Sequence, residues 1–313
     1  MSAAKIAATE RAPACFYVQR ANHTMIDFRN ILFPVSMSDQ DHRTAPYVQA
    51  MARRFRSTVV MLHVQEFAAE AYAPADLLTP AILEFTQEVN QTRRKQFESF
   101  LAAEFEGIPL QRVVAEGDPA HEIAACAKTR DIGLVMMPTH GYGRFRRFLL
   151  GSITAKVLHD VNCPVWTSVH TPEISSANAD GCGRLLCAVD IDAREVRVIR
   201  WAAEFAETNH CELQLVHAIP GAWSTDTEKG PPFGEFLFRL AKEELERLQK
   251  QAGTSLPAVI RGGKPERVLH QAAEELKPDL IICGRGDLNH PLGRLHTHVY
   301  SIIRESPCPV ISV

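Results

Sequence analysis

A glycine-containing loop and the helix expected after it carry the clearest chemistry in this sequence. The stretch MMPTHGYGRFRRFLLGSITAKVL, residues 136–158, has the pattern of a buried strand, a loop with Gly141, and a helix starting near Gly151 and Ser152. Glycine lets the backbone approach a ligand without a side chain between them. Amides at a helix N-terminus attract phosphate, and the Ser152 hydroxyl can cap the helix or donate to a phosphate oxygen. The pattern favours an anion site, and positive charge is added by Arg144, Arg146 and Arg147.

The same loop has ordinary interpretations. A glycine loop before a capped helix is a common connection, and three arginines on an exposed loop are often simply solvated. The loop alone therefore leaves phosphate binding and a plain connection equally open. The rest of the chain has to decide between them.

Other catalytic and metal-binding patterns are disfavoured. The sequence contains neither G-x-x-x-x-G-K-[ST] nor G-x-S-x-G, which argues against a Walker-type ATPase and a serine hydrolase. His121-Glu122 lacks the second histidine of H-E-x-x-H. His296 and His298 are two residues apart, so they would not share a face of a helix, and His290 adds no usable spacing. We expect no metal site and no catalytic base.

Self-similarity divides the chain into two copies of one module. ILFPV at 31–35 matches LLCAV at 185–189, and VVMLHV at 59–64 matches LQLVHA at 213–218, both at an offset of 154 residues (185 − 31 and 213 − 59). Later pairs keep the same order at offsets of 146 (279 − 133) and 145 (308 − 163). Short β-rich runs alternate with amphipathic stretches, which is typical of βαβ units and a parallel sheet.

Each half is expected to contain five buried strands and four helices. The first half has strands at 31–35, 58–64, 110–115, 132–137 and 163–169, and helices at 42–55, 79–106, 119–129 and 151–160. The second half has strands at 185–189, 212–218, 256–260, 279–283 and 308–313, and helices at 193–207, 233–252, 265–276 and 296–305.

Length and composition fit two ordinary globular domains. The chain has 313 residues, 46% of them hydrophobic and 23% charged. We expect an N-terminal tail over 1–27, a first domain over 28–170, a linker rich in Pro, Ser, Asn and Gly over 171–183, and a second domain over 184–313.

Charge and hydropathy exclude several partners. The net charge of −3 gives no electrostatic footprint for nucleic acid. No apolar run approaches the length of a membrane span, and the first residues lack the apolar core of a secretory signal, so we expect a cytoplasmic protein. Eight cysteines in a chain of this length are expected to be reduced rather than to form a disulfide framework.

Both halves resemble the universal stress protein family, over about residues 28–313. ATP-binding members of that family carry Gly-x-x-Gly, nine residues, and then Gly-Ser or Gly-Thr. Gly141, Gly151 and Ser152 match this pattern, whereas Pro138 replaces the first glycine and Ser36 replaces an aspartate after the first strand. The resemblance implies an α/β fold with two Rossmann-like domains of the adenine nucleotide α-hydrolase type. Each would have five parallel strands in the order 3-2-1-4-5, with helices on both faces.

The resemblance also implies that the first half binds ATP or a related adenine nucleotide, with or without Mg²⁺. Its backbone at Val64 would meet adenine. The implied binding residues are Pro34, Ser36, Val64, Met137, His140, Gly141, Gly151, Ser152, Ile153 and Thr154.

The second half departs from the pattern in a complementary way. It keeps an aspartate at Asp190 and a glycine at Gly284, which are weaker binding candidates. Its loop is one residue shorter and places His296 and Thr297 where the first half has Gly151 and Ser152. A side chain at position 296 would crowd a phosphate, so we expect weak or no triphosphate binding there.

The resemblance implies a tandem stress-response regulator that binds nucleotide with little or no turnover, although slow hydrolysis stays open. It also implies that CPVWTSV and CPVISV, the last strand of each half, meet antiparallel across a pseudo-two-fold as an intramolecular pseudo-dimer. The alternative is a nucleotide-independent scaffold of the same fold that recruits a protein partner. Pro138 and Ser36 favour this alternative, whereas Gly141, Gly151 and Ser152 favour nucleotide.

Overall fold

The computed structural model describes residues 26–65, 80–139, 150–168, 183–220, 232–286 and 298–313. The first half contains β1 (Asn30–Val35), α1 (Asp39–Phe55), β2 (Thr58–Gln65), α2 (Pro80–Ser99), β3 (Leu110–Glu116), α3 (Pro119–Thr129), β4 (Leu134–Pro138), α4 (Ser152–Asp160) and β5 (Val165–Ser168). The second half contains β6 (Arg184–Ala188), α5 (Glu195–Asn209), β7 (Glu212–Ile219), α6 (Pro232–Ala252), β8 (Ala258–Gly262), α7 (Pro265–Leu276), β9 (Leu280–Cys283), α8 (Val299–Glu305) and β10 (Val310–Ser312).

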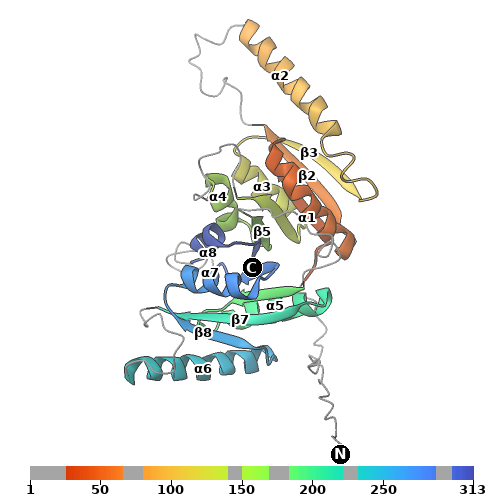
Figure 1. The fold of residues 1–313 in the computed structure, drawn as a ribbon. Coiled ribbons are helices and arrows are strands. Elements are labelled where there is room, and N and C mark those ends of the chain that lie inside the picture. The colour runs from red at the N-terminus through yellow and green to blue at the C-terminus, as the bar shows by residue number, and fades with distance from the viewer. Residues whose placement is uncertain (1–25, 66–79, 140–149, 169–182, 221–231, 287–297) are drawn as a thin grey trace, which may run out of the picture.

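The ten strands of the described residues form one sheet in the order β3-β2-β1-β4-β5-β10-β9-β6-β7-β8. Figure 1 shows β3 and β2 at one end of the molecule and β7 and β8 toward the other. Each half therefore has the strand order 3-2-1-4-5, which confirms the prediction. Every pair within a half is parallel, and β5 and β10 pair antiparallel, with Trp166 opposite Ile311. This pairing gives each of the two fifth strands a hydrogen-bonded neighbour on both sides, so neither is left as an open edge.

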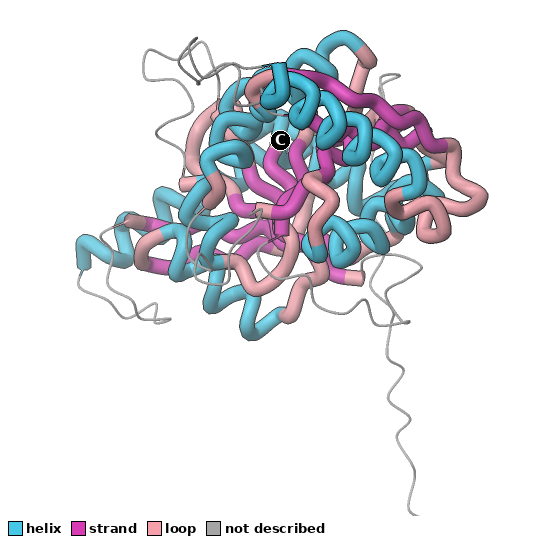
Figure 2. Tube along the Cα trace, turned by 90° about the horizontal axis from the view of Figure 1, so that it is seen from above, coloured by secondary structure: helices cyan, strands magenta, loops and turns pink. Residues whose placement is uncertain are grey.

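Helices cover both faces of the sheet, as the tube in Figure 2 shows. Side chains of β1 alternate between the two faces: Ile31 and Phe33 pack with α1, whereas Leu32 packs with α3 and α4. Each apolar cluster runs across both halves. On the α1 face, Phe28 lies 4.8 Å from Phe55 and 6.4 Å from Phe205 of α5, measured between ring centroids.

Element boundaries differ from the predictions at a few places. The long helix expected over 79–106 is wrong at its end, because α2 stops at Ser99 and Leu101 has a φ of 55°, which a continuing helix does not allow. The first helix begins at Asp39 rather than at 42, because Ser38 and Asp41 form a capping box. Among the described helices, none has the length and apolar character of a membrane span.

Gly133, just before β4, is required by close backbone contact. A Cβ atom at this position would lie 1.6 Å from the carbonyl oxygen of Asp27. Ile26 and Phe28, on either side of Asp27, are buried, so this segment cannot move away freely.

We predict that Gly133→Ala lowers the free energy of unfolding by about 3 kcal/mol, because the backbone must shift to remove the clash. Urea denaturation measures the change. Gly107→Ala is the control: that glycine has a φ of +77° and open space around it, so only the strain of a left-handed residue, about 1 kcal/mol, is expected. Equal losses in the two variants would contradict the steric explanation.

Candidate functional site

The candidate site of the first half lies where the strand order reverses. β1 has β2 on one side and β4 on the other. The three strands are parallel, so their carboxyl ends, and the segments that follow them, meet at the same edge of the sheet. In open parallel sheets, ligands bind in the crevice at this point. The end of β4 and the start of α4 supply the backbone of the site.

Hydrogen bonds hold the two ends of the glycine loop together. The backbone N–H of Thr139 donates to the Ser168 carbonyl at 3.2 Å, and its buried hydroxyl donates to the same oxygen at 3.0 Å. The N–H of Gly151 donates to the Thr139 carbonyl at 2.9 Å. The two ends of the loop, Thr139 and Gly151, are therefore held together beside the end of β4. The loop between, with the predicted residues His140 and Gly141 and the three arginines, lies outside the described residues.

The N-terminus of α4 faces this crevice. Gly151 is the N-cap, with φ −61° and ψ 145°, and the helix begins at Ser152, whose hydroxyl therefore does not act as the N-cap. The first-turn amides of a helix have no carbonyl partner within that helix. Because the Gly151 amide is already bonded to Thr139, the donors for an anion are the amides that follow, from Ser152 onward.

The remaining predicted residues play different parts around these amides. Ser152 is exposed and Ile153 is 37% exposed, so both face solvent at the start of α4. Thr154 is buried, and its hydroxyl donates to the carbonyls of Pro138 and Thr139 at 3.3 and 3.2 Å. Thr154 therefore anchors α4 to the end of β4.

Three predicted residues belong to the strands. Pro34 is buried in β1 and Met137 in β4, and Val64, near the end of β2, is half-buried. Met137 and Val64 pack in the apolar cluster on the α3 and α4 face. These residues lie toward the carboxyl ends of β1, β2 and β4, and the chain enters α4 beside the end of β4.

A buried carboxylate that the sequence analysis missed lies beside Ser36. Asp41 of α1 is 1% exposed, and its Oδ2 accepts from the backbone N–H groups of Ser36 and Ser38 at 3.0 and 2.8 Å. Both serine hydroxyls also donate to this oxygen, at 3.3 and 3.2 Å. Burial raises the pKa of Asp41, and these hydrogen bonds oppose the rise. The spacing Ser-x-x-Asp at 38–41, a capping-box pattern, was the available signal.

Two buried histidines were also missed. His63 of β2 has its Nδ1 atom 3.1 Å from the Val35 carbonyl, and His217 of β7 has its Nδ1 atom 2.8 Å from the Val189 carbonyl. They occupy matching positions in the two halves and tie the second strand of each half to the end of the first. The repeated histidine in VVMLHV and LQLVHA was the signal.

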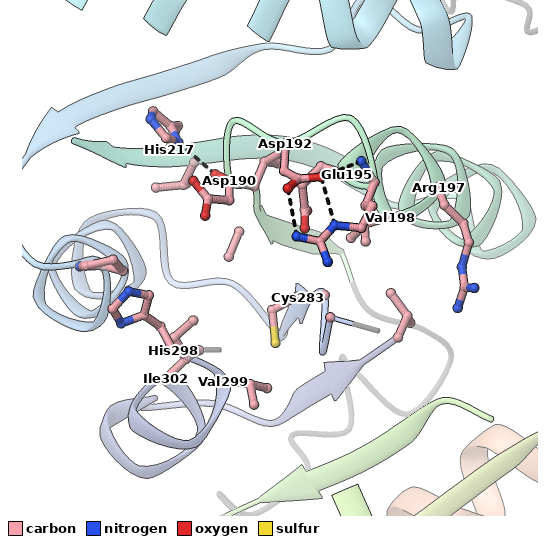
Figure 3. A pocket seen from close by; sticks show the side chains of 18 of the residues that line it. Asp190, Asp192, Glu195, Arg197, Val198, His217, Cys283, His298, Val299 and Ile302 are labelled. Atoms are coloured by element: carbon pink, nitrogen blue, oxygen red, sulfur yellow. Dashed lines mark hydrogen bonds and ion pairs between the residues drawn. The ribbon is translucent and has the colours of Figure 1, made fainter. Parts of the chain in front are cut away.

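The second half has a cavity of about 960 Å³ at the matching place (Figure 3). Asp190, Asp192 and Glu195 stand where the first half has Ser36, Ser38 and Asp41, at the same offset of 154 residues (190 − 36). In Figure 3 these three carboxyl groups lie side by side, across the cavity from His298, Val299 and Ile302.

Replacing the two serines removes their hydroxyl donors, whereas the backbone N–H of Asp190 still donates to the Glu195 carboxyl group. Asp190 accepts from the Ile191 N–H at 2.7 Å, and Asp192 pairs with Arg194 at 2.8 Å. The Oε2 atom of Glu195 is inaccessible and has no hydrogen-bond partner in the described structure. Burial, followed by the negative charges of Asp190 and Asp192, raises the pKa of Glu195 to about 8.

Gly284, the other candidate of the second half, has a packing reason to be glycine. A Cβ atom there would lie 3.0 Å from Oε1 of Glu195 and 3.0 Å from a methyl group of Val198. Gly284, Asp190 and Glu195 all line the one cavity.

Metal ligands do not gather in the part of the chain that the structure describes. It contains no group of three or more His, Cys, Asp or Glu side chains arranged to hold a metal ion. His290 and His296 lie outside the described residues.

Two copies of a doubly wound α/β domain, each with the strand order 3-2-1-4-5, define the class of protein. The sequence model of the universal stress protein family matches residues 27–168 and 182–313. The chain therefore belongs to the universal stress protein family, with two copies of its domain.

Individual relatives agree with this assignment. A universal stress protein of Methanocaldococcus jannaschii is 28% identical over 138 residues, which is 44% of this chain and 80% of the relative. One from Methanothermobacter thermautotrophicus is also 28% identical over 138 residues, covering 44% of this chain and 93% of the relative. The crystal structure of a universal stress protein from Archaeoglobus fulgidus has a similar fold, with a TM-score of 0.63, 21% identity, and coverage of 91% of this chain and 98% of that one.

The raised pKa of Glu195 predicts a pH-dependent stability. Unfolding returns its pKa from about 8 to an ordinary value near 4.5, so the folded state holds the proton more tightly. The stabilisation that this proton gives to the folded state is therefore complete below pH 4.5 and is lost as pH rises to about 8. Above that pH, Glu195→Gln should be more stable than the wild type by about 3 kcal/mol.

Urea denaturation between pH 5 and 8.5 measures this difference. The advantage of Glu195→Gln should grow with pH across this range. Glu246→Gln, which changes an exposed carboxylate on α6, is the control and should stay parallel to the wild type. A Glu195→Gln curve that also stays parallel would show that Glu195 is ionised in the folded protein.

Proposed function

We propose that the first half of this protein binds ATP or a related adenine nucleotide and that the protein acts as a regulator in a stress response. The observation that carries the proposal is the start of α4 at the switch point, where its first-turn amides lack carbonyl partners within the helix and the ends of the glycine loop are tied at Thr139 and Gly151. Family membership supports adenine as the base.

The phosphates would lie on the amides of Ser152 and Ile153, and glycine at position 151 would let them approach. Val64 and Met137 would border the base, since both lie at the carboxyl ends of strands next to the crevice. Ser36 would offer a hydroxyl where family members carry a carboxylate, so contact with the ribose would be through a neutral group. Mg²⁺, when present, would offset phosphate charge.

We further propose binding without appreciable turnover. Asp41, a buried carboxylate of the first half, is 1% exposed and accepts four hydrogen-bond contacts on one oxygen at the start of α1. A carboxylate enclosed in this way does not reach a water molecule that it would have to deprotonate. Regulation by occupancy fits such a site better than hydrolysis does.

Gly151→Asp is expected to abolish ATP binding while leaving the fold intact. The backbone at 151 is extended, and aspartate is a favoured N-cap residue in this conformation. Its carboxylate would accept from the first-turn amides and repel phosphate. Isothermal titration of ATP with Mg²⁺ should give heat for the wild type and an affinity at least about 100-fold weaker for the variant.

Gly253→Asp is the matched control. It adds the same charge at an exposed glycine after α6, far along the chain from the site, and should bind ATP like the wild type. Equal affinity for the wild type and Gly151→Asp would contradict the proposed site. No heat for the wild type with any adenine nucleotide would support the nucleotide-independent scaffold instead.

A further inference from the structure

Arg285 reaches from the second half into the first. It lies two residues after the end of β9 and is 2% exposed, which is unusual for an arginine. Its guanidinium donates to the carbonyls of Leu158 at 3.2 Å and Val161 at 3.3 Å, and also to the carbonyl of Cys163. All three acceptors lie at or just after the C-terminus of α4.

These contacts supply what the end of α4 lacks. The last carbonyls of a helix have no partner within it, and they carry partial negative charge. A guanidinium presents several donors in a rigid fork, so one Arg285 side chain can bind several carbonyls and offset that charge. The hydroxyl of Tyr300, in α8, donates to the Ala155 carbonyl at 3.3 Å and adds a second contact from the same half.

The other end of α4 carries the proposed phosphate site. Its N-terminus is fixed on β4 by Thr154 and by the Gly151 amide, within the first half. Its C-terminus is fixed by Arg285. The position of the first-turn amides therefore depends on contacts from both halves.

The matching position in the first half carries a threonine, whose short side chain lacks the guanidinium that Arg285 uses. Thr139 occupies the matching position in the first half (285 − 146 = 139), and its N–H donates to Ser168 just as the N–H of Arg285 donates to Val313 at 2.9 Å. The backbone hydrogen bonds at positions 139 and 285 are therefore equivalent. The threonine hydroxyl, however, returns to Ser168 within its own half.

We propose that Arg285 is a positioning residue, through which the docked second half sets the geometry of the phosphate-binding helix in the first half. The nucleotide site of the first half would then be complete only in the joined protein. This inference rests on the proposed function for the identity of the ligand. The part that concerns how Arg285 holds α4 does not depend on a ligand.

Arg285→Ala in the full-length protein tests the inference. ATP affinity measured by titration calorimetry should fall about tenfold. Arg285→Lys, which keeps the charge but cannot reach three carbonyls at once, should lie between the wild type and Arg285→Ala and serves if the alanine variant does not fold. Hydrogen exchange of the amides from 152 to 160, measured without nucleotide, should become faster in both variants.

Arg261→Ala is the matched control, since it removes an arginine of the second half that pairs with Glu275 in that same half. It should change neither ATP affinity nor exchange in α4. If the wild type binds ATP and Arg285→Ala binds it equally well, the inference is overturned while the proposed function stands. If the wild type binds no nucleotide, the proposed function fails, and unchanged exchange in α4 would then overturn the inference separately.

Discussion

The antiparallel pairing of β5 with β10 is the interaction on which the rest of this structure depends. It joins two five-stranded sheets into one and places both fifth strands in the middle. Because the sheet is continuous, the apolar clusters on its faces are continuous too, and Phe28 of the first half contacts Trp201 and Phe205 of the second. The same pairing brings Arg285 within reach of α4.

Within that frame the two halves have become chemically different. The first half pairs one buried acid with two serines, and the acid is fully provided with donors. The second half has three acids at the same places, and one of them, Glu195, is buried without a partner for Oε2. Negative charge at this place opposes phosphate, whereas the first-turn amides of α4 attract it. This divergence is the reason we propose anion binding in the first half and a structural role for the second.

The repeat and the strand pattern predicted most of the fold, because buried parallel strands are continuous apolar runs that the sequence displays directly. Contacts between distant residues were not predictable in the same way. The Ser-x-x-Asp spacing at 38–41 indicates a helix cap but not how deeply Asp41 is buried, and the surroundings of Glu195 give no such signal, because burial is decided by how α1 and α5 pack on the sheet. Arg285 follows the strand expected over 279–283, and only the joined sheet shows that its side chain enters the other half. The end of α2 depended on one left-handed residue, Leu101.

Backbone amide NMR shifts followed during an ATP titration test the central claim most directly, because they report on each amide separately. The account predicts that the largest shifts occur at Ser152 and Ile153, with little change at Asp190 and Gly284. Shifts concentrated at Asp190 and Gly284 would contradict it, because nucleotide would then occupy the acidic cavity of the second half.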